Sequence, residues 1–138
     1  MKKVFFQGAF DILNHGHILA FRDAKKQGDY LIVGLNTDEL IKSYKHKSSI
    51  LPYWQRKIIL ESIKYIDEVI PMNTFSPLEN LKDIDVYVIY IGWKDSKVKE
   101  IEYMESKGGK VFFTPEYDNV IHSSEIKSLL LKNEGGME

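Results

Sequence analysis

Short apolar runs alternate along the chain with longer stretches in which apolar residues recur at helical spacing. The apolar runs are rich in valine, isoleucine and aromatic residues, which is typical of buried parallel strands. They predict strands at Lys3–Gln7, Tyr30–Leu35, Glu68–Pro71, Val86–Ile91 and Lys110–Thr114. The other stretches predict helices at Ile18–Gln27, Pro52–Tyr65, Ser96–Lys107 and Ser123–Lys132. This alternation predicts an α/β fold of βαβ units, with a parallel sheet and helices on both faces.

The predicted sheet is doubly wound and Rossmann-like, with five parallel strands in the order 3-2-1-4-5. Residues 1–132 form a single domain in this interpretation, and residues 133–138 form a flexible tail. The ends of the first and fourth strands flank the point where the winding direction changes, which is where such sheets bind ligands. Gly8–His17 follows the first strand and Gly92–Asp95 follows the fourth. The two segments are therefore predicted to meet at one crevice.

Composition and charge exclude several classes of protein. The 138 residues, 43% of them apolar, are enough for one ordered domain with its own core. The net charge of −1 argues against non-specific binding to nucleic acid or to an anionic membrane. Cysteine is absent, which excludes disulfides and thiol catalysis and suits a reducing, cytoplasmic location. No apolar run approaches the ~18 residues of a membrane span, so we expect neither a transmembrane helix nor a signal peptide.

The loop between the first predicted strand and helix carries the chemistry of the sequence. Gly8 and Gly16 allow the backbone to approach a bound group closely. His17 stands in the first turn of the helix, where backbone N–H groups attract anions, and its ring offers a further hydrogen bond. Asp11 is expected to hold the loop. The pattern predicts a site for a phosphate group.

These residues resemble the cytidylyltransferase-like nucleotidyltransferase family, and most closely the bacterial glycerol-3-phosphate cytidylyltransferase type. The resemblance spans nearly the whole chain. The matching segments are Gly8–Leu13, His15–His17, Gly28–Val33, Asn36–Glu39, Gln55–Lys57 and Tyr65–Pro71, with a weaker match at Ile121–Lys127. The fold it implies is the HUP-type variant of the Rossmann-like sheet.

The resemblance implies a reaction in which a substrate phosphate attacks the α-phosphorus of CTP and pyrophosphate leaves. Glycerol 3-phosphate is the first expectation for the acceptor, Mg²⁺ is expected to accompany the triphosphate without a dedicated protein metal site, and a homodimer is expected. His17 is the predicted catalytic donor, whereas His15 occupies the variable position of the motif. The nucleotide-binding loop predicted by the resemblance comprises Gly8, Ala9, Phe10, Asp11 and Gly16.

The chain departs from the family at Asn14, which stands where the motif has its first histidine. Asparagine keeps a neutral donor for a phosphate oxygen but carries no positive charge. Three interpretations follow: a working variant whose charge comes from elsewhere, a nucleotide-binding protein with weak catalysis, or a different substrate that compensates for the loss. The candidate replacements for the missing charge are Lys45 and Lys47 in the loop after the second strand, Lys94, and His122.

The resemblance assigns roles along the rest of the crevice. Arg56 is predicted to bind the substrate phosphate or to brace a loop. Gly92 and Trp93 are predicted to contact the nucleotide, with Trp93 either stacking on a base or filling the wall. Ser123–Ser124 would open the last helix and hold phosphates, and His122 would replace an arginine that the family carries upstream.

A second enzymatic interpretation keeps the fold and changes the substrates. It is adenylyl transfer from ATP to FMN, a sugar phosphate or pantetheine phosphate, since the choice of base depends on backbone groups near Gly92 that a sequence does not display.

Overall fold

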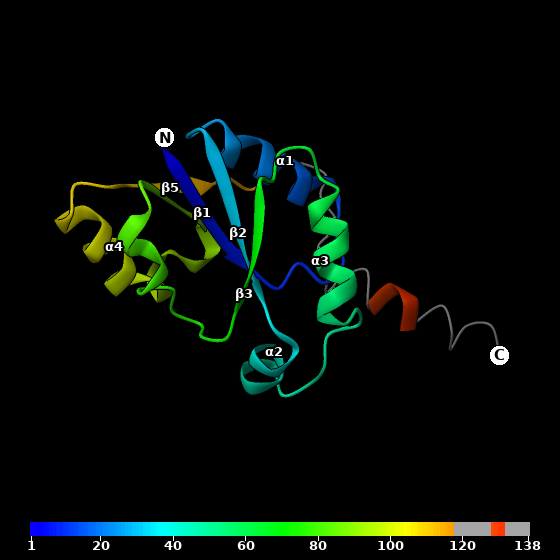
Figure 1. Cartoon of the computed structure of the whole chain (residues 1–138). Helices are drawn as coiled ribbons and strands as arrows, with labels where there is room; N and C mark the ends of the chain where they lie inside the picture. Colours follow the sequence, from blue (N-terminus) through cyan, green and yellow to red (C-terminus); the bar gives the residue numbers. More distant parts are fainter. Residues whose placement is uncertain (118–127, 132–138) are drawn as a thin grey trace.

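The computed structural model describes residues 1–117 and 128–131 of the chain. Its centre is one sheet of five parallel strands in the order β3-β2-β1-β4-β5 (Figure 1). The strands are β1 (Lys3–Gly8), β2 (Tyr30–Asn36), β3 (Glu68–Met72), β4 (Val86–Tyr90) and β5 (Lys110–Thr114). The order and the parallel pairing confirm the predicted doubly wound α/β sheet, and the strand ends lie within one residue of the predicted ones.

Helices cover both faces of the sheet, as predicted. The α-helices are α1 (His15–Lys25), α2 (Asp38–Lys45), α3 (Tyr53–Glu61) and α4 (Val98–Ser106), and the 3-10 helices are η1 (Asn80–Asp83) and η2 (Ile91–Ser96). One core contains residues of α1 and α3, including Phe21 and Leu60. The other contains residues of α2, η1 and α4, including Leu81 and Met104. Figure 1 places α3 and α4 at opposite ends of the sheet.

The central strand β1 explains why the apolar runs are almost continuous. Val4 and Phe6 point into the first core, whereas Phe5 between them points into the second. Because both faces are covered, the three buried positions in the middle of the strand, Val4 to Phe6, are all apolar. A Cβ on Gly34 of β2 would lie 2.6 Å from the Phe5 ring, so glycine is needed there for close packing.

The segment after β2, predicted as a loop, forms α2 instead. Thr37 caps this helix by accepting a hydrogen bond from the Leu40 N–H, and acidic Asp38 and Glu39 occupy its first turn. Leu40 and Tyr44 pack against the second core. The capping threonine and the acidic first turn were signals that would have predicted this helix.

Helices α3 and α4 are shorter in the structure than their periodicity indicated, whereas α1 begins at His15, before the predicted start at Ile18, and ends at Lys25. Because Pro52 lies just before α3, the predicted start is close, but the helix ends four residues early at Glu61. Of the last predicted helix, residues 128–131 are described and are helical, and the remainder lies outside the described residues. Within the described part of the chain, no helix has the length and apolar character needed to cross a membrane.

Candidate active site

A cleft of about 310 Å³ lies where the carboxyl ends of β1, β2, β4 and β5 meet the start of α1. This is the crevice that the topology predicts, because ligands of such sheets bind beside the point where the winding reverses. The cleft brings together parts of the chain far apart in sequence: the loop after β1, the end of α2, the segment around Phe75, η2, and the residues after β5.

The loop after β1 turns at Phe10, whose φ of 45° lies in the left-handed region. The Phe10 ring packs against Phe6, Phe21 and His17, with ring centroids 5.0 to 6.0 Å apart. A Cβ on Gly8 would lie 2.7 Å from the Phe10 ring. The missing side chain at Gly8 therefore makes room for an aromatic ring, and the approach of the Gly8 backbone to a phosphate stays a prediction.

Asn14 and His17 form a capping box at the start of α1. The Asn14 Oδ1 accepts hydrogen bonds from the N–H groups of Gly16 (2.9 Å) and His17 (3.3 Å). In return, the Asn14 N–H donates to Nδ1 of His17 over 3.1 Å. The amide oxygen of Asn14 thus satisfies backbone donors at the helix start. This is a structural role that the motif comparison did not predict.

The same hydrogen bond fixes the chemistry of His17. Because Nδ1 accepts a hydrogen bond from the Asn14 N–H, a neutral His17 ring carries its own proton on Nε2. The ring lines the cleft and lies edge-on to Phe10, which fixes its orientation. His17 is therefore positioned as an N–H donor to an anion at the helix N-terminus, where the helix dipole adds to the attraction.

Asp11 holds a loop, as predicted. Its carboxylate is buried and accepts hydrogen bonds from the N–H groups of Ile50 and Leu51, each over 2.8 Å. These bonds fasten the connection before α3 to the loop that follows β1.

Arg56 is a bracing residue, and the interpretation that it contacts the substrate phosphate is not supported. The residue is 1% exposed and is absent from the described cleft lining. Its guanidinium donates to the carbonyls of Ala9, Asn36 and Leu51 and to the Asp38 carboxylate, over 2.6 to 3.0 Å. Four of the five guanidinium N–H groups are used in this way. Arg56 therefore connects the loop after β1, the end of β2 and α3.

Of the two lysines after β2 that were predicted as replacement charges, the described cleft lining includes Lys45 and not Lys47. Lys45 is the last residue of α2, and His46 ends the helix with a φ of 57°, so the chain turns away before Lys47. The Lys45 ammonium lies 6.0 Å from the centre of the Tyr44 ring, which also lines the cleft. The geometry favours Lys45 as the cation of this wall.

Trp93 lines the cleft, whereas Gly92 and Lys94 are not among the described lining residues. The Trp93 ring packs at 5.3 Å from the ring of Phe75. The Lys94 ammonium instead lies 5.6 Å from the Phe113 ring. Because Trp93 is 42% exposed, its ring forms a wall that a ligand can still contact. Lys94 is a poorer candidate for the missing charge than Lys45.

Lys97 is a cation in the cleft that sequence reasoning missed. It is 7% exposed, donates to the Phe75 carbonyl over 2.8 Å, and lies 3.7 Å from the centre of the Phe75 ring. Burial lowers the pKa of Lys97, partly opposed by the charge of Glu100. Nothing in the local pattern around position 97 distinguishes this lysine from a surface lysine, because its burial depends on a loop that precedes it by 22 residues.

A polar network at the ends of β1 and β2 also lines the cleft. Gln7 donates to the Asn36 Oδ1 (2.9 Å) and to the Thr74 carbonyl (3.0 Å), and the Asn36 amide donates to the Tyr44 hydroxyl (3.2 Å). Gln7 and Asn36 are polar residues at the ends of apolar strands, and that position could have predicted from the sequence that they line the cleft. They give the cleft a hydrogen-bonding floor.

Tyr90 and Glu116 form the wall on the side of β4 and β5. The Tyr90 hydroxyl donates to the Glu116 carboxylate. The next residue, Tyr117, donates to Asp23 of α1 over 2.6 Å. Sequence reasoning named this stretch only for its missing arginine. The predicted phosphate ligands His122, Ser123 and Ser124 lie outside the described residues.

The fold and the cleft together define a class of ligand site. A doubly wound sheet whose switch-point cleft is lined by a histidine, a lysine and a helix N-terminus is suited to bind a phosphorylated ligand. The model of the cytidylyltransferase-like family matches residues 5–129, and the chain belongs to this family. The resemblance stated from the motifs is confirmed.

The names of several similar proteins state an enzymatic activity. The chain is 42% identical over 110 residues to the glycerol-3-phosphate cytidylyltransferase of Staphylococcus aureus, covering 78% of this chain and 80% of the relative. It is 41% identical over 125 residues to the enzyme of the same name from Bacillus spizizenii, covering 88% and 85%. An FAD synthase from Ferroglobus placidus is 41% identical over 86 residues, covering 59% of this chain and 55% of that protein.

A solved structure supports the fold independently. The lipopolysaccharide core biosynthesis protein from Thermoplasma volcanium GSS1 superimposes with a TM-score of 0.74 at 24% identity, covering 86% of this chain and 99% of that one. At this identity the likeness concerns the fold alone.

Proposed function

We propose that this nucleotidyltransferase transfers CMP from CTP to glycerol 3-phosphate and releases pyrophosphate. The observation that carries the proposal is His17, which lies in the cleft at the start of α1 with Nδ1 engaged by the Asn14 N–H. The similarity to two glycerol-3-phosphate cytidylyltransferases over most of the chain supports the choice of substrates.

In the proposed reaction, an oxygen of the acceptor phosphate attacks the α-phosphorus of CTP. A new P–O bond forms as the bond from the α-phosphorus to the bridging oxygen breaks, and that oxygen leaves with pyrophosphate. The chain contributes alignment and charge rather than a covalent intermediate. The Nε2–H of His17 donates to a phosphate oxygen whose negative charge grows in the transition state. Lys45, which also lines the cleft, neutralises charge on the phosphates.

Asn14 is, in this proposal, a neutral helix cap in a working enzyme. Its oxygen satisfies two backbone N–H groups, so replacement of the motif histidine leaves the start of α1 intact. The positive charge absent at position 14 is supplied by Lys45 and by the helix dipole.

Mg²⁺ is proposed to enter with the triphosphate as part of the substrate. Among the described residues there is no group of three or more His, Cys, Asp or Glu side chains that could hold a metal ion. Mg²⁺ commonly retains several waters and is held largely by substrate phosphates. A chelator should therefore abolish turnover without lowering the melting temperature of the protein.

A homodimer is proposed from the outer face of α3. Trp54 and Ile58 are 61% and 57% exposed and lie one helical turn apart, and Ile59 next to them is 41% exposed. Apolar side chains gathered in this way mark interaction surfaces. The net charge of −1 opposes self-association little.

Pyrophosphate release measured with CTP and with ATP tests the proposed reaction. The acceptors are glycerol 3-phosphate, ethanolamine phosphate, a sugar phosphate, pantetheine phosphate and FMN. We expect the highest kcat/KM for CTP with glycerol 3-phosphate. Higher kcat/KM for ATP with any acceptor would replace the proposal by adenylyl transfer. Tight nucleotide binding without pyrophosphate release from any pair would make the chain a binding protein.

A further inference from the structure

The carboxylate of Glu116 is an unexpected group in a cleft that binds phosphates. The described residues lining the cleft include two carboxylates, Asp11 and Glu116. Asp11 is buried and engaged by two backbone N–H groups, whereas Glu116 is exposed. Glu116 is therefore the carboxylate that a ligand can reach. A negative charge here repels phosphate, so this end of the cleft must receive another part of the ligand.

The topology separates the charges of the cleft. Lys45 follows β2 and His17 follows β1, on one side of the winding reversal. Glu116 follows β5 and pairs with Tyr90 at the end of β4, on the other side. A nucleotide lying across the switch point with its phosphates at His17 and Lys45 thus extends its nucleoside toward Glu116.

The Glu116 carboxylate is held in place. Tyr90 donates to it, and the Tyr90 ring is seated over Gly92, where a Cβ would lie 2.6 Å from the ring. The hydrogen bond to Glu116, helped by burial and by the charge of Glu116, raises the pKa of Tyr90 to about 12, so the phenol remains a donor near neutral pH. Tyr117 anchors the next residue to α1 through Asp23.

A carboxylate accepts hydrogen bonds at roughly four positions, and among the described residues Tyr90 uses one of them. We propose that Glu116, oriented by Tyr90, accepts a hydrogen bond from a neutral donor of the nucleoside and determines which nucleotide binds. The donor is either a ribose hydroxyl or the exocyclic amino group of the base. This inference rests on the proposed function, because it takes CTP as the ligand.

Nucleotide affinity tests the inference without requiring turnover. Calorimetric Kd values for CTP, UTP and dCTP are measured with the wild type, Glu116→Gln, Tyr90→Phe and the control Glu102→Gln, which removes a carboxylate from the exposed face of α4. We expect Glu116→Gln to weaken CTP binding about tenfold, as the loss of a charged hydrogen bond does, and Tyr90→Phe to weaken it about threefold. The control leaves Kd unchanged.

The two analogues distinguish the donors. If Glu116 accepts from the amino group of the base, the wild type binds CTP more tightly than UTP, and Glu116→Gln binds the two equally. If Glu116 accepts from a ribose hydroxyl, the wild type binds CTP more tightly than dCTP, and Glu116→Gln binds these two equally. Unchanged preferences and an unchanged Kd for CTP in Glu116→Gln would overturn the inference, as would an absence of CTP binding by the wild type. Failure of the proposed function gives a different result from failure of this inference: CTP binds, but no pyrophosphate is released.

Discussion

At the scale of single residues, His17 caps the helix with one ring nitrogen, and in the proposed reaction it contacts the ligand with the other. Its Nδ1 completes the capping box with Asn14, and its Nε2 is the nitrogen that carries the proton of the neutral ring. A substitution that removes the ring therefore tests catalysis cleanly only if the cap is kept. Glutamine at this position of a capping box can reach back to the same N–H group.

We expect His17→Gln and His17→Ala to lower kcat by a factor on the order of 100, because both remove the donor to the developing charge. Steady-state pyrophosphate release measures this. His15→Ala is the matched control, since His15 is exposed and is not among the described cleft residues. Activity of His17→Gln close to that of the control would remove His17 from the mechanism.

Two substitutions of Asn14 distinguish its effect on protein stability from its effect on nucleotide affinity. Asn14→Ala should lower the free energy of unfolding by about 1 kcal/mol, because the cap is lost. Asn14→Asp keeps the acceptor oxygen, and we expect unchanged stability with nucleotide binding weakened at least about tenfold by a negative charge beside the phosphates. Denaturant unfolding and calorimetric titration measure the two effects. A stable Asn14→Asp protein with undiminished affinity would place the phosphates elsewhere.

The position of His17 in the first turn of α1 was predicted from the strand–loop–helix pattern, because it depends on neighbours in the chain. The loop-holding role of Asp11 was also expected, but its partners Ile50 and Leu51 lie 39 and 40 residues away and could not be named from the sequence. Arg56 was left between two interpretations, since its acceptors lie up to 47 residues away. Lys97 was missed for the same reason.

At the scale of elements, strands were predicted to within a residue because burial on both faces leaves an apolar run with sharp ends. Helix α2 was missed because eight residues give little periodicity to detect. The elements are then fastened by aspartates. Asp38 of α2 accepts from the Tyr53 N–H at the start of α3 and from Arg56, and Asp67 accepts from the Leu31 N–H of β2 and from Lys25 of α1.

These aspartates make the stability depend on pH. Burial acts to raise the pKa of Asp38 and Asp67, but the hydrogen bonds and nearby cations outweigh burial and lower both below the ordinary value of 3.8. A group with a lowered folded-state pKa stabilises the fold above the unfolded-state pKa, and this stability is lost as the pH falls. We expect the melting temperature to fall steadily from pH 5 to about pH 3. In Asp67→Asn this fall should be smaller, whereas Asp83→Asn, which changes an exposed carboxyl, should follow the wild type.

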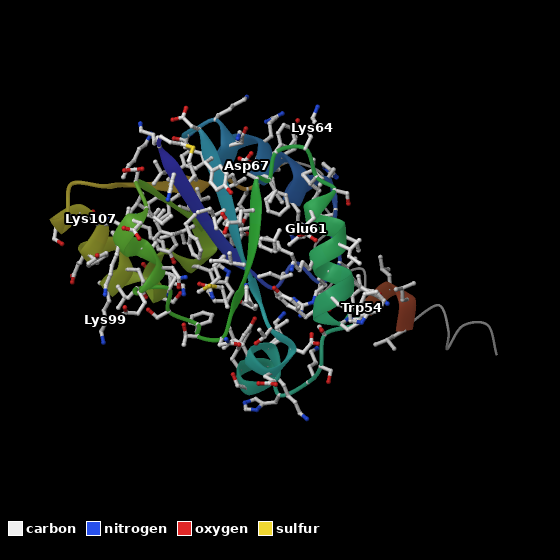
Figure 2. The ribbon with its side chains drawn as sticks, in the orientation of Figure 1. Trp54, Glu61, Lys64, Asp67, Lys99 and Lys107 are labelled. Carbon is white, nitrogen blue, oxygen red and sulfur yellow. The ribbon has the colours of Figure 1, made fainter. Side chains whose placement is uncertain are left out.

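At the scale of the whole molecule, the cleft and the exposed face of α3 are separate surfaces. Figure 2 labels Trp54 on α3 and Lys99 on α4, at opposite ends of the sheet. The cleft residues come from the loops at the carboxyl ends of the strands. The proposed dimer surface can therefore be altered without changing a described residue of the cleft.

We expect Ile58→Glu to convert a dimer into a monomer, because a charge placed in an apolar contact loses its hydration without gaining a partner. Light scattering after size-exclusion chromatography measures the mass. Lys99→Glu reverses a charge on the distant helix α4 and should leave the mass unchanged. A wild-type chain that elutes as a monomer at all concentrations would contradict the proposed dimer.

The contact between Gly8 and the Phe10 ring also constrains how this loop can vary. Since a Cβ at position 8 and an aromatic ring at position 10 compete for one volume, a side chain at position 8 becomes acceptable only after the ring at position 10 has shrunk. The left-handed backbone at position 10 further limits which residue types can replace Phe10. Proteins that descend from this chain are therefore expected to keep both residues or to replace both, so that substitutions at the two positions are correlated.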